Sequence, residues 1–133
     1  DQLRYFSPQG IVNIVWAFAR LNHGAPAFFD AMAEVIEESI RDLKMQDPRG
    51  VANTVWAFAT RNHDAPELFD AVVEIAVPRL GDFQPQEISN TVWAFARLSH
   101  CAPKLFDSAA EIAAPRLGDF QPQNVANTVW AFA

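Results

Sequence analysis

One seven-residue segment, Asn-Thr-Val-Trp-Ala-Phe-Ala, recurs along this chain at a nearly fixed spacing. It starts at Asn53, Asn90 and Asn127, and a fourth copy that starts at Asn13 carries Ile14 in place of threonine. Successive copies are 40, 37 and 37 residues apart. A period in this range is typical of an array of supersecondary units that bury their apolar faces against one another. Such arrays offer long binding surfaces, so the period favours a binding protein over an enzyme.

Each unit has the pattern of two helices. Proline suits the first turn of a helix, and a second proline opens the second helix, at Pro26, Pro66 and Pro103. Gly81 and Gly118 mark the expected end of the second helix in a left-handed cap conformation. Pro78 and Pro115 lie late in that helix and predict a kink or an early end. The first unit lacks this proline and holds three extra residues, so we expect its second helix to run longer.

These features predict an all-α, right-handed α-solenoid of helical-pair repeats. The expected divisions are the tail of a preceding repeat at 1–7, three repeats at 8–47, 48–84 and 85–121, and the first helix of a truncated repeat at 122–133. A tail is expected because the pattern Leu-x-x-Phe-x-Pro-Gln starts at Leu3 and again at Leu80 and Leu117. We therefore interpret the chain as a window of a longer array.

Winding the first helix of each unit at about 100° per residue gives a wide apolar sector and one narrow strip. The strip is expected to comprise Gly10, Asn13, Ala17, Arg20 and Gly24, then Gly50, Asn53, Ala57, Thr60 and Asp64, then Glu87, Asn90, Ala94, Arg97 and Cys101. Stacked helices lie about 8–10 Å apart, so the strip would repeat like rungs along one face.

The recurring tryptophans and asparagines each have two interpretations. The indoles could be stacking platforms for bases, but they fall inside the apolar arc. We therefore expect core wedges at Trp16, Trp56, Trp93 and Trp130. The repeated asparagine amide could pair with base edges or bridge to the backbone of the next repeat, and both remain open. The positions that vary between units, and that could read different bases, are Gly10/Gly50/Glu87/Asn124 and Arg20/Thr60/Arg97.

The histidines occupy equivalent places in consecutive units, at His23, His63 and His100. Neighbouring units are separated by about 8–10 Å, whereas zinc needs its nitrogen ligands at about 2 Å. We therefore expect no metal site. Each imidazole is expected instead to meet the free carbonyls at the C-terminal end of the first helix.

The formal net charge of −6 argues against strong, salt-driven binding to nucleic acid. The acidic residues concentrate on the second helices, however, and the first helices carry few charges of either sign. A helix is about 10–12 Å across, and the Debye length at physiological salt is about 8 Å. The first-helix face is therefore screened from most of the acidic charge, and RNA remains a possible ligand there.

Other function classes lack their sequence signals. No apolar run approaches the roughly 18 residues of a membrane span. The single cysteine, Cys101, allows no internal disulfide and favours a reducing compartment. There is no glycine-rich phosphate loop, zinc motif or activated nucleophile. We expect no enzymatic activity, no cofactor, no small-molecule substrate and no membrane partner.

The period, together with Asn-Thr-Val-Trp-Ala-Phe-Ala-Arg on the first helix, resembles octotricopeptide repeats over nearly the whole chain. It is similar also to the repeats of FAST-kinase-like and RAP-domain proteins. The resemblance implies an RNA-binding factor of chloroplasts or mitochondria that acts in the stability, processing or translation of organellar transcripts. It implies that the first helices face single-stranded RNA, through Asn13, Arg20, Asn53, Thr60, Asn90, Arg97 and Asn127.

The alternative function is a protein-protein interaction scaffold of the armadillo or tetratricopeptide kind. Exposed apolar residues or a continuous acidic groove on the strip would favour a protein partner. Polar residues that vary between units, with arginine among them, favour RNA, because helical-repeat RNA binders read about one base per unit with a few side chains. The strip offers asparagine, arginine, threonine and alanine, a composition that favours RNA.

Overall fold

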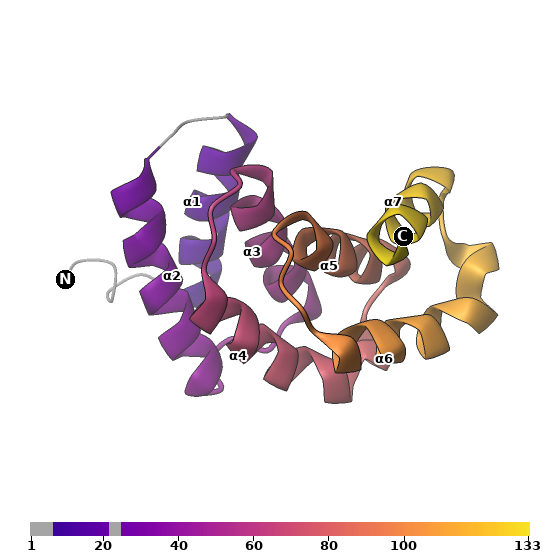
Figure 1. The fold of residues 1–133 in the computed structure, drawn as a ribbon. Helices are drawn as coiled ribbons and strands as arrows, with labels where there is room; N and C mark the ends of the chain where they lie inside the picture. Colours follow the sequence, from indigo (N-terminus) through magenta and orange to yellow (C-terminus); the bar gives the residue numbers. More distant parts are fainter. Residues whose placement is uncertain (1–6, 22–24) are drawn as a thin grey trace.

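The computed structural model describes residues 7–21 and 25–133, and these residues fold as an all-α protein, which confirms the predicted class (Figure 1). The described part contains seven α-helices: α1 (Pro8–Arg20), α2 (Pro26–Arg41), α3 (Pro48–Thr60), α4 (Pro66–Ala76), α5 (Pro85–Arg97), α6 (Pro103–Ala113) and α7 (Pro122–Phe132). Two 3₁₀ helices follow α4 and α6, namely η2 (Val77–Asp82) and η3 (Ala114–Asp119). The predicted tail at 1–7 lies outside the described residues except for Ser7.

Every one of these α-helices begins with a proline, as predicted, because the first turn of a helix needs no backbone N–H. In α1 and α3 a capping side chain also satisfies a free amide beside the proline, whereas the alanines before α2, α4 and α6 make no such side-chain cap. Ser7 and Asp47 accept from the backbone amides of Gly10 and Gly50, each at 3.1 Å. The local sequence therefore fixes where each helix starts.

The late prolines end the second helices early, as predicted. Both α4 and α6 have 11 residues, whereas α2, which lacks this proline, has 16. Proline removes a helical hydrogen bond and its ring clashes with the preceding turn, so the chain tightens into η2 and η3. The predicted left-handed caps at Gly81 and Gly118 are wrong, because no described glycine has a positive φ. The 3₁₀ turns end instead at the extended residues Phe83 and Phe120.

The helices form two layers (Figure 1). Helices α1, α3, α5 and α7 pack side by side in chain order, and we call them the A layer. Helices α2, α4 and α6 pack along them as the B layer, and each A-layer helix before α7 contacts the B-layer helix that follows it. Phenylalanines from both layers meet in the core, where the rings of Phe69 and Phe95 lie 4.7 Å apart and both are buried.

Polar contacts also tie each unit to the one before it. Arg79 Nη1 donates to the carbonyl oxygen of Gln46 at 2.8 Å, and Arg116 Nη2 donates to that of Phe83 at 3.2 Å. Both arginines are therefore structural. Among the described residues, no helix is long and apolar enough to cross a membrane.

The described histidines also link successive units. The Nε2 of His63 lies 2.7 Å from Asp30 Oδ1, and that of His100 lies 2.9 Å from Asp70 Oδ1. The predicted partner, a free carbonyl at the end of the first helix, is wrong for both, because a carboxylate of the preceding B-layer helix lies within reach. His23 lies outside the described residues. The described residues contain no group of His, Cys, Asp and Glu arranged to hold a metal.

The exposed end of the A layer predicts a gradient of local stability. The segment Asn-Thr-Val-Trp-Ala-Phe-Ala occurs at 90–96, in α5, and again at 127–133, in and just after α7. Because the two segments have the same sequence, a difference between their amide exchange rates reflects a difference in packing. Several α5 side chains are buried, whereas α7 has none, and Trp130 is 52% exposed. We expect hydrogen–deuterium exchange to be much faster at 127–133 than at 90–96. Equal protection of the two segments in a monomer would contradict this packing.

Candidate nucleic-acid interface

Along the accessible edge of each A-layer helix, the successive residues are spaced by four, three and four positions in the sequence, as in Gln9, Asn13, Trp16 and Arg20. Helix geometry places such positions on one face. We call this set the A-layer stripe. It shares the asparagine and helix-end positions with the strip predicted from the sequence, but it contains the tryptophan where that strip contains the alanine. It comprises Gln9, Asn13, Trp16 and Arg20 on α1; Arg49, Asn53, Trp56 and Thr60 on α3; Gln86, Asn90, Trp93 and Arg97 on α5; and Gln123, Asn127 and Trp130 on α7.

All seven residues predicted to contact RNA lie on this stripe, but they are not equally accessible. Asn13, Arg20 and Arg97 are exposed, whereas the remaining four are partly buried, namely Asn53, Thr60, Asn90 and Asn127. The Thr60 hydroxyl is buried and has no hydrogen-bond partner within the described part of the chain. Thr60 therefore offers a ligand little polar contact, unlike the arginines at the same position in the neighbouring helices.

The predicted strip is wrong at one glycine and two alanine positions, and its member Gly24 lies outside the described residues. Gly50, Ala57 and Ala94 are buried. The equivalent alanine of α1, Ala17, is exposed. Helices α3 and α5 each pack against a preceding A-layer helix, whereas no described A-layer helix precedes α1. We conclude that the preceding A-layer helix covers this position. A small side chain suits it because it lets the two helices approach closely.

The expectation that the four tryptophans are core wedges is also wrong. Trp16 is 37% and Trp130 is 52% exposed, and Trp56 and Trp93 are only partly buried. In α3 and α5 the phenylalanine two residues further along the helix, Phe58 and Phe95, is fully buried and fills the core instead. At the edge of the layer the indole buries part of its ring and keeps its N–H near water, as amphipathic aromatic side chains prefer.

The tryptophans form two pairs along the stripe. The ring centroids of Trp16 and Trp56 are 6.2 Å apart with an interplanar angle of 31°, and those of Trp93 and Trp130 are 6.4 Å apart at 40°. The guanidinium carbon of Arg20 lies 5.6 Å from the Trp16 ring centroid, within cation–π range. Neighbouring units therefore present π-faces side by side, one of them beside a positive charge.

A groove of about 720 Å³ crosses the A layer at the asparagine positions. This volume is typical of a ligand site. The groove is lined by Asn13, Trp16, Ala17, Arg49, Asn53, Gln84, Gln86, Glu87 and Asn90. It combines amides, one indole, one guanidinium and one carboxylate, and its lining comes from α1, α3, α5 and the residue before α5.

The asparagine amides of the groove are available to a ligand. Gln9 Nε2 donates to Asn13 Oδ1 at 2.9 Å, which leaves the Asn13 amide nitrogen as a donor. Asn53 and Asn90 make no side-chain hydrogen bond with any residue that the structure describes. The interpretation of the asparagines as bridges to a neighbouring backbone therefore has no support in the described contacts. Amides that can both donate and accept suit the edges of nucleobases.

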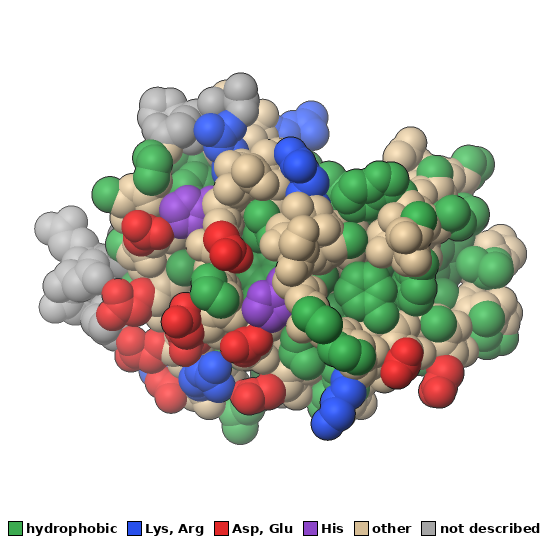
Figure 2. Space-filling model, in the orientation of Figure 1, with side chains coloured by type: hydrophobic (Ala, Val, Ile, Leu, Met, Phe, Trp, Pro, Cys, Tyr) green, Lys and Arg blue, Asp and Glu red, His purple; other side chains and the backbone are tan. Residues whose placement is uncertain are grey.

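The charge separation expected from the sequence is present. Acidic side chains gather over α2 and α4 (Figure 2), whereas the A-layer helices contain one acidic residue, Glu87. The stripe therefore lies on the layer with the weaker negative potential.

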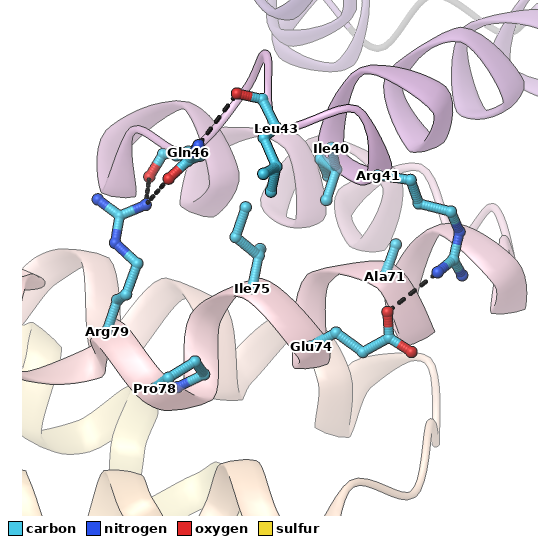
Figure 3. A pocket seen from close by; sticks show the side chains of 9 residues that line it. All are labelled: Ile40, Arg41, Leu43, Gln46, Ala71, Glu74, Ile75, Pro78 and Arg79. Atoms are coloured by element: carbon cyan, nitrogen blue, oxygen red, sulfur yellow. Dashed lines mark hydrogen bonds and ion pairs between the residues drawn. The ribbon is translucent and has the colours of Figure 1, made fainter.

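A second pocket, of about 370 Å³, lies in the B layer between the end of α2 and α4 (Figure 3). Its charged groups are already paired with protein atoms. Arg41 donates to Glu37 at 2.9 Å and to Glu74 at 3.0 Å, and its pKa is raised by the hydrogen bond with Glu37 and by the charge of Glu74. Arg79 binds Gln46. This pocket therefore offers an ion few unpaired groups, and the A-layer groove is the better candidate site.

A comparison with protein-family models finds no family that matches this chain, and a comparison with curated proteins finds no match. Function is therefore inferred from the residues of the stripe and the groove.

Burial differences within α5 predict different effects of two aromatic truncations. Phe95 is fully buried, so Phe95→Ala should lower the free energy of unfolding by about 3–5 kcal/mol. Trp93 is partly exposed on the stripe, so Trp93→Ala should cost less than half as much. Urea unfolding of the two variants, which differ by two positions on one helix, measures both values. A larger loss from Trp93→Ala than from Phe95→Ala would contradict the placement of the tryptophan.

Proposed function

We propose that this chain is a segment of a right-handed α-solenoid of the octotricopeptide-repeat type and that it binds single-stranded RNA along the A-layer stripe. The observation that carries the proposal is the recurrence, in all four A-layer helices, of a partly exposed indole beside an accessible amide. Stacking of bases on aromatic side chains is worth about 1–3 kcal/mol per base. Bases are free to stack in this way only in a single strand, which favours single-stranded over duplex ligands.

The charges of the stripe fit this ligand. Arg20, Arg49 and Arg97 are exposed cations on the A-layer edge, and they can meet phosphates while the indoles and amides meet bases. The B-layer carboxylates lie on the far side of the A-layer helices and are screened by salt over about 8 Å. The overall charge of −6 is therefore compatible with RNA on this face.

The expected mode is modular, with each unit offering its indole and its amide to about one base, and Arg20 and Arg97 adding a cation at the ends of α1 and α5. The resemblance to octotricopeptide repeats extends the proposal to a role in the stability, processing or translation of organellar transcripts. The exposed tryptophans alone would also suit a peptide. The amides and arginines that alternate with them, and the lack of a continuous acidic groove on the stripe, favour RNA over a peptide.

A double charge reversal on the stripe tests the site. Arg20→Glu with Arg97→Glu replaces attraction by repulsion at two points of the strand, and it removes the cation beside Trp16. We expect this variant to bind single-stranded RNA at least tenfold more weakly, a change of about 1.4 kcal/mol. Fluorescence anisotropy of a labelled randomised RNA pool at fixed salt measures the loss.

The matched control is Lys44→Glu with Lys104→Glu, which makes the same change in net charge at exposed residues outside the stripe. It is preferable to reversing Arg79 and Arg116, because these hold neighbouring units together. We expect the control to bind nearly as well as the unchanged chain. Equal losses in both variants would assign the effect to net charge, and no binding of the unchanged chain to RNA would favour the protein-scaffold alternative.

A further inference from the structure

One residue of the groove stands apart from the others in charge. Glu87 is the only carboxylate among the residues that line the groove and the only acidic residue of the four A-layer helices. It lies in the first turn of α5 and is partly buried. A negative charge at this place opposes phosphate, so it is not explained by general affinity for a nucleic-acid backbone.

Helix capping does not require this charge. Glu87 Oε1 accepts from the backbone amide of Gln84 at 2.7 Å. In α7 the equivalent residue, Asn124, accepts from the backbone amide of Gln121 at 3.2 Å through a neutral amide oxygen. A neutral side chain therefore makes the same cap, and the second carboxylate oxygen of Glu87 has no described partner.

The groove around Glu87 restricts what can approach it. A carboxylate accepts hydrogen bonds and cannot donate them, so a base that lies against it must present an N–H group. The amino group of cytosine is such a donor and pairs with Glu or Asp. Uracil carries a carbonyl oxygen at the same ring position, which would place an acceptor against an acceptor. The N3–H group of uracil lies between two carbonyl oxygens, so a carboxylate that accepts from it must also approach those oxygens. The two bases have nearly the same size and stacking surface, so this edge is what separates them.

The neighbours of Glu87 supply the remaining parts of a base site. Asn90, one turn further along α5, and Asn53 on the neighbouring helix line the same groove and have amides without described partners. The Arg49 guanidinium is the one cation of the lining and can hold a phosphate of the same strand. The carboxylate thus lies among groups that suit a base edge.

We infer that Glu87 makes the groove select a nucleobase with an exocyclic amine, cytosine in preference to uracil. This inference rests on the proposed binding of single-stranded RNA. It makes Glu87 a specificity-determining residue, and it gives the third unit a base preference that the units with Gly10 and Gly50 at the equivalent position lack.

The test compares equal-length oligocytidine and oligouridine at one fixed salt concentration, with the unchanged chain and with Glu87→Gln. Glutamine keeps an oxygen that can cap the Gln84 amide, and a melting curve checks that the fold is retained. We expect the unchanged chain to prefer oligocytidine by about tenfold, equivalent to about 1.4 kcal/mol. In Glu87→Gln the ratio should fall to about twofold or less, mainly because oligouridine binds more tightly.

Glu111→Gln is the matched control, because it makes the same charge change at an exposed residue of α6 outside the groove. It should leave the ratio unchanged. RNA binding with no preference in the unchanged chain, a preference that survives Glu87→Gln, or an equal change in Glu111→Gln would each overturn the inference and leave the proposed function intact. Absence of binding to both oligonucleotides would overturn the inference, and absence of binding to the randomised RNA pool as well would overturn the proposed function.

Discussion

Each A-layer helix packs beside helices of nearly the same sequence, and this packing decides which of its residues reach solvent. In α3 and α5 the neighbouring helix covers the alanine positions, while Phe58 and Phe95 point into the core. One edge of each helix remains. Because the sequence of the helix recurs, the residues on that edge recur too, and a periodic row of indoles and amides follows from the packing together with the repeat. A row of this kind suits a ligand that is itself a repeating chain.

The two layers differ in what their polar residues do. In the B layer and its connections, Arg79, Arg116, His63 and His100 each reach back to the preceding unit and hold successive units in register. Arg41 is likewise bonded to glutamates. In the A layer, the central asparagines have no described partner, and one carboxylate interrupts an otherwise acid-free surface. The polar groups that hydrogen-bond within the protein therefore lie mainly outside the stripe, and the stripe carries polar groups that have no described partner.

The prolines and the repeat period were sufficient to predict the helices, because each proline acts on its own helical turn and the period repeats that local signal in every unit. They could not decide which edge of the A-layer helix stays open. On a helical wheel, Ala57 and Trp56 lie on either side of Asn53 and close to it. Only the position of the neighbouring helix shows that the alanine is covered and that the tryptophan is partly exposed. Hydrophobicity favoured the opposite assignment. The partner of His100, Asp70, is 30 residues away, and no local pattern predicts that contact.

Direct contact between RNA and the stripe can be measured at the indole N–H groups. Nitrogen-15 NMR resolves one indole signal for each tryptophan, and single Trp→Phe variants assign the four signals. During titration with single-stranded RNA, the indole signals of Trp16, Trp56, Trp93 and Trp130 should shift or broaden, while the backbone amides of α4 and α6 stay in place. Saturating RNA that moves the α4 and α6 amides and leaves all four indoles unchanged would contradict binding at the stripe.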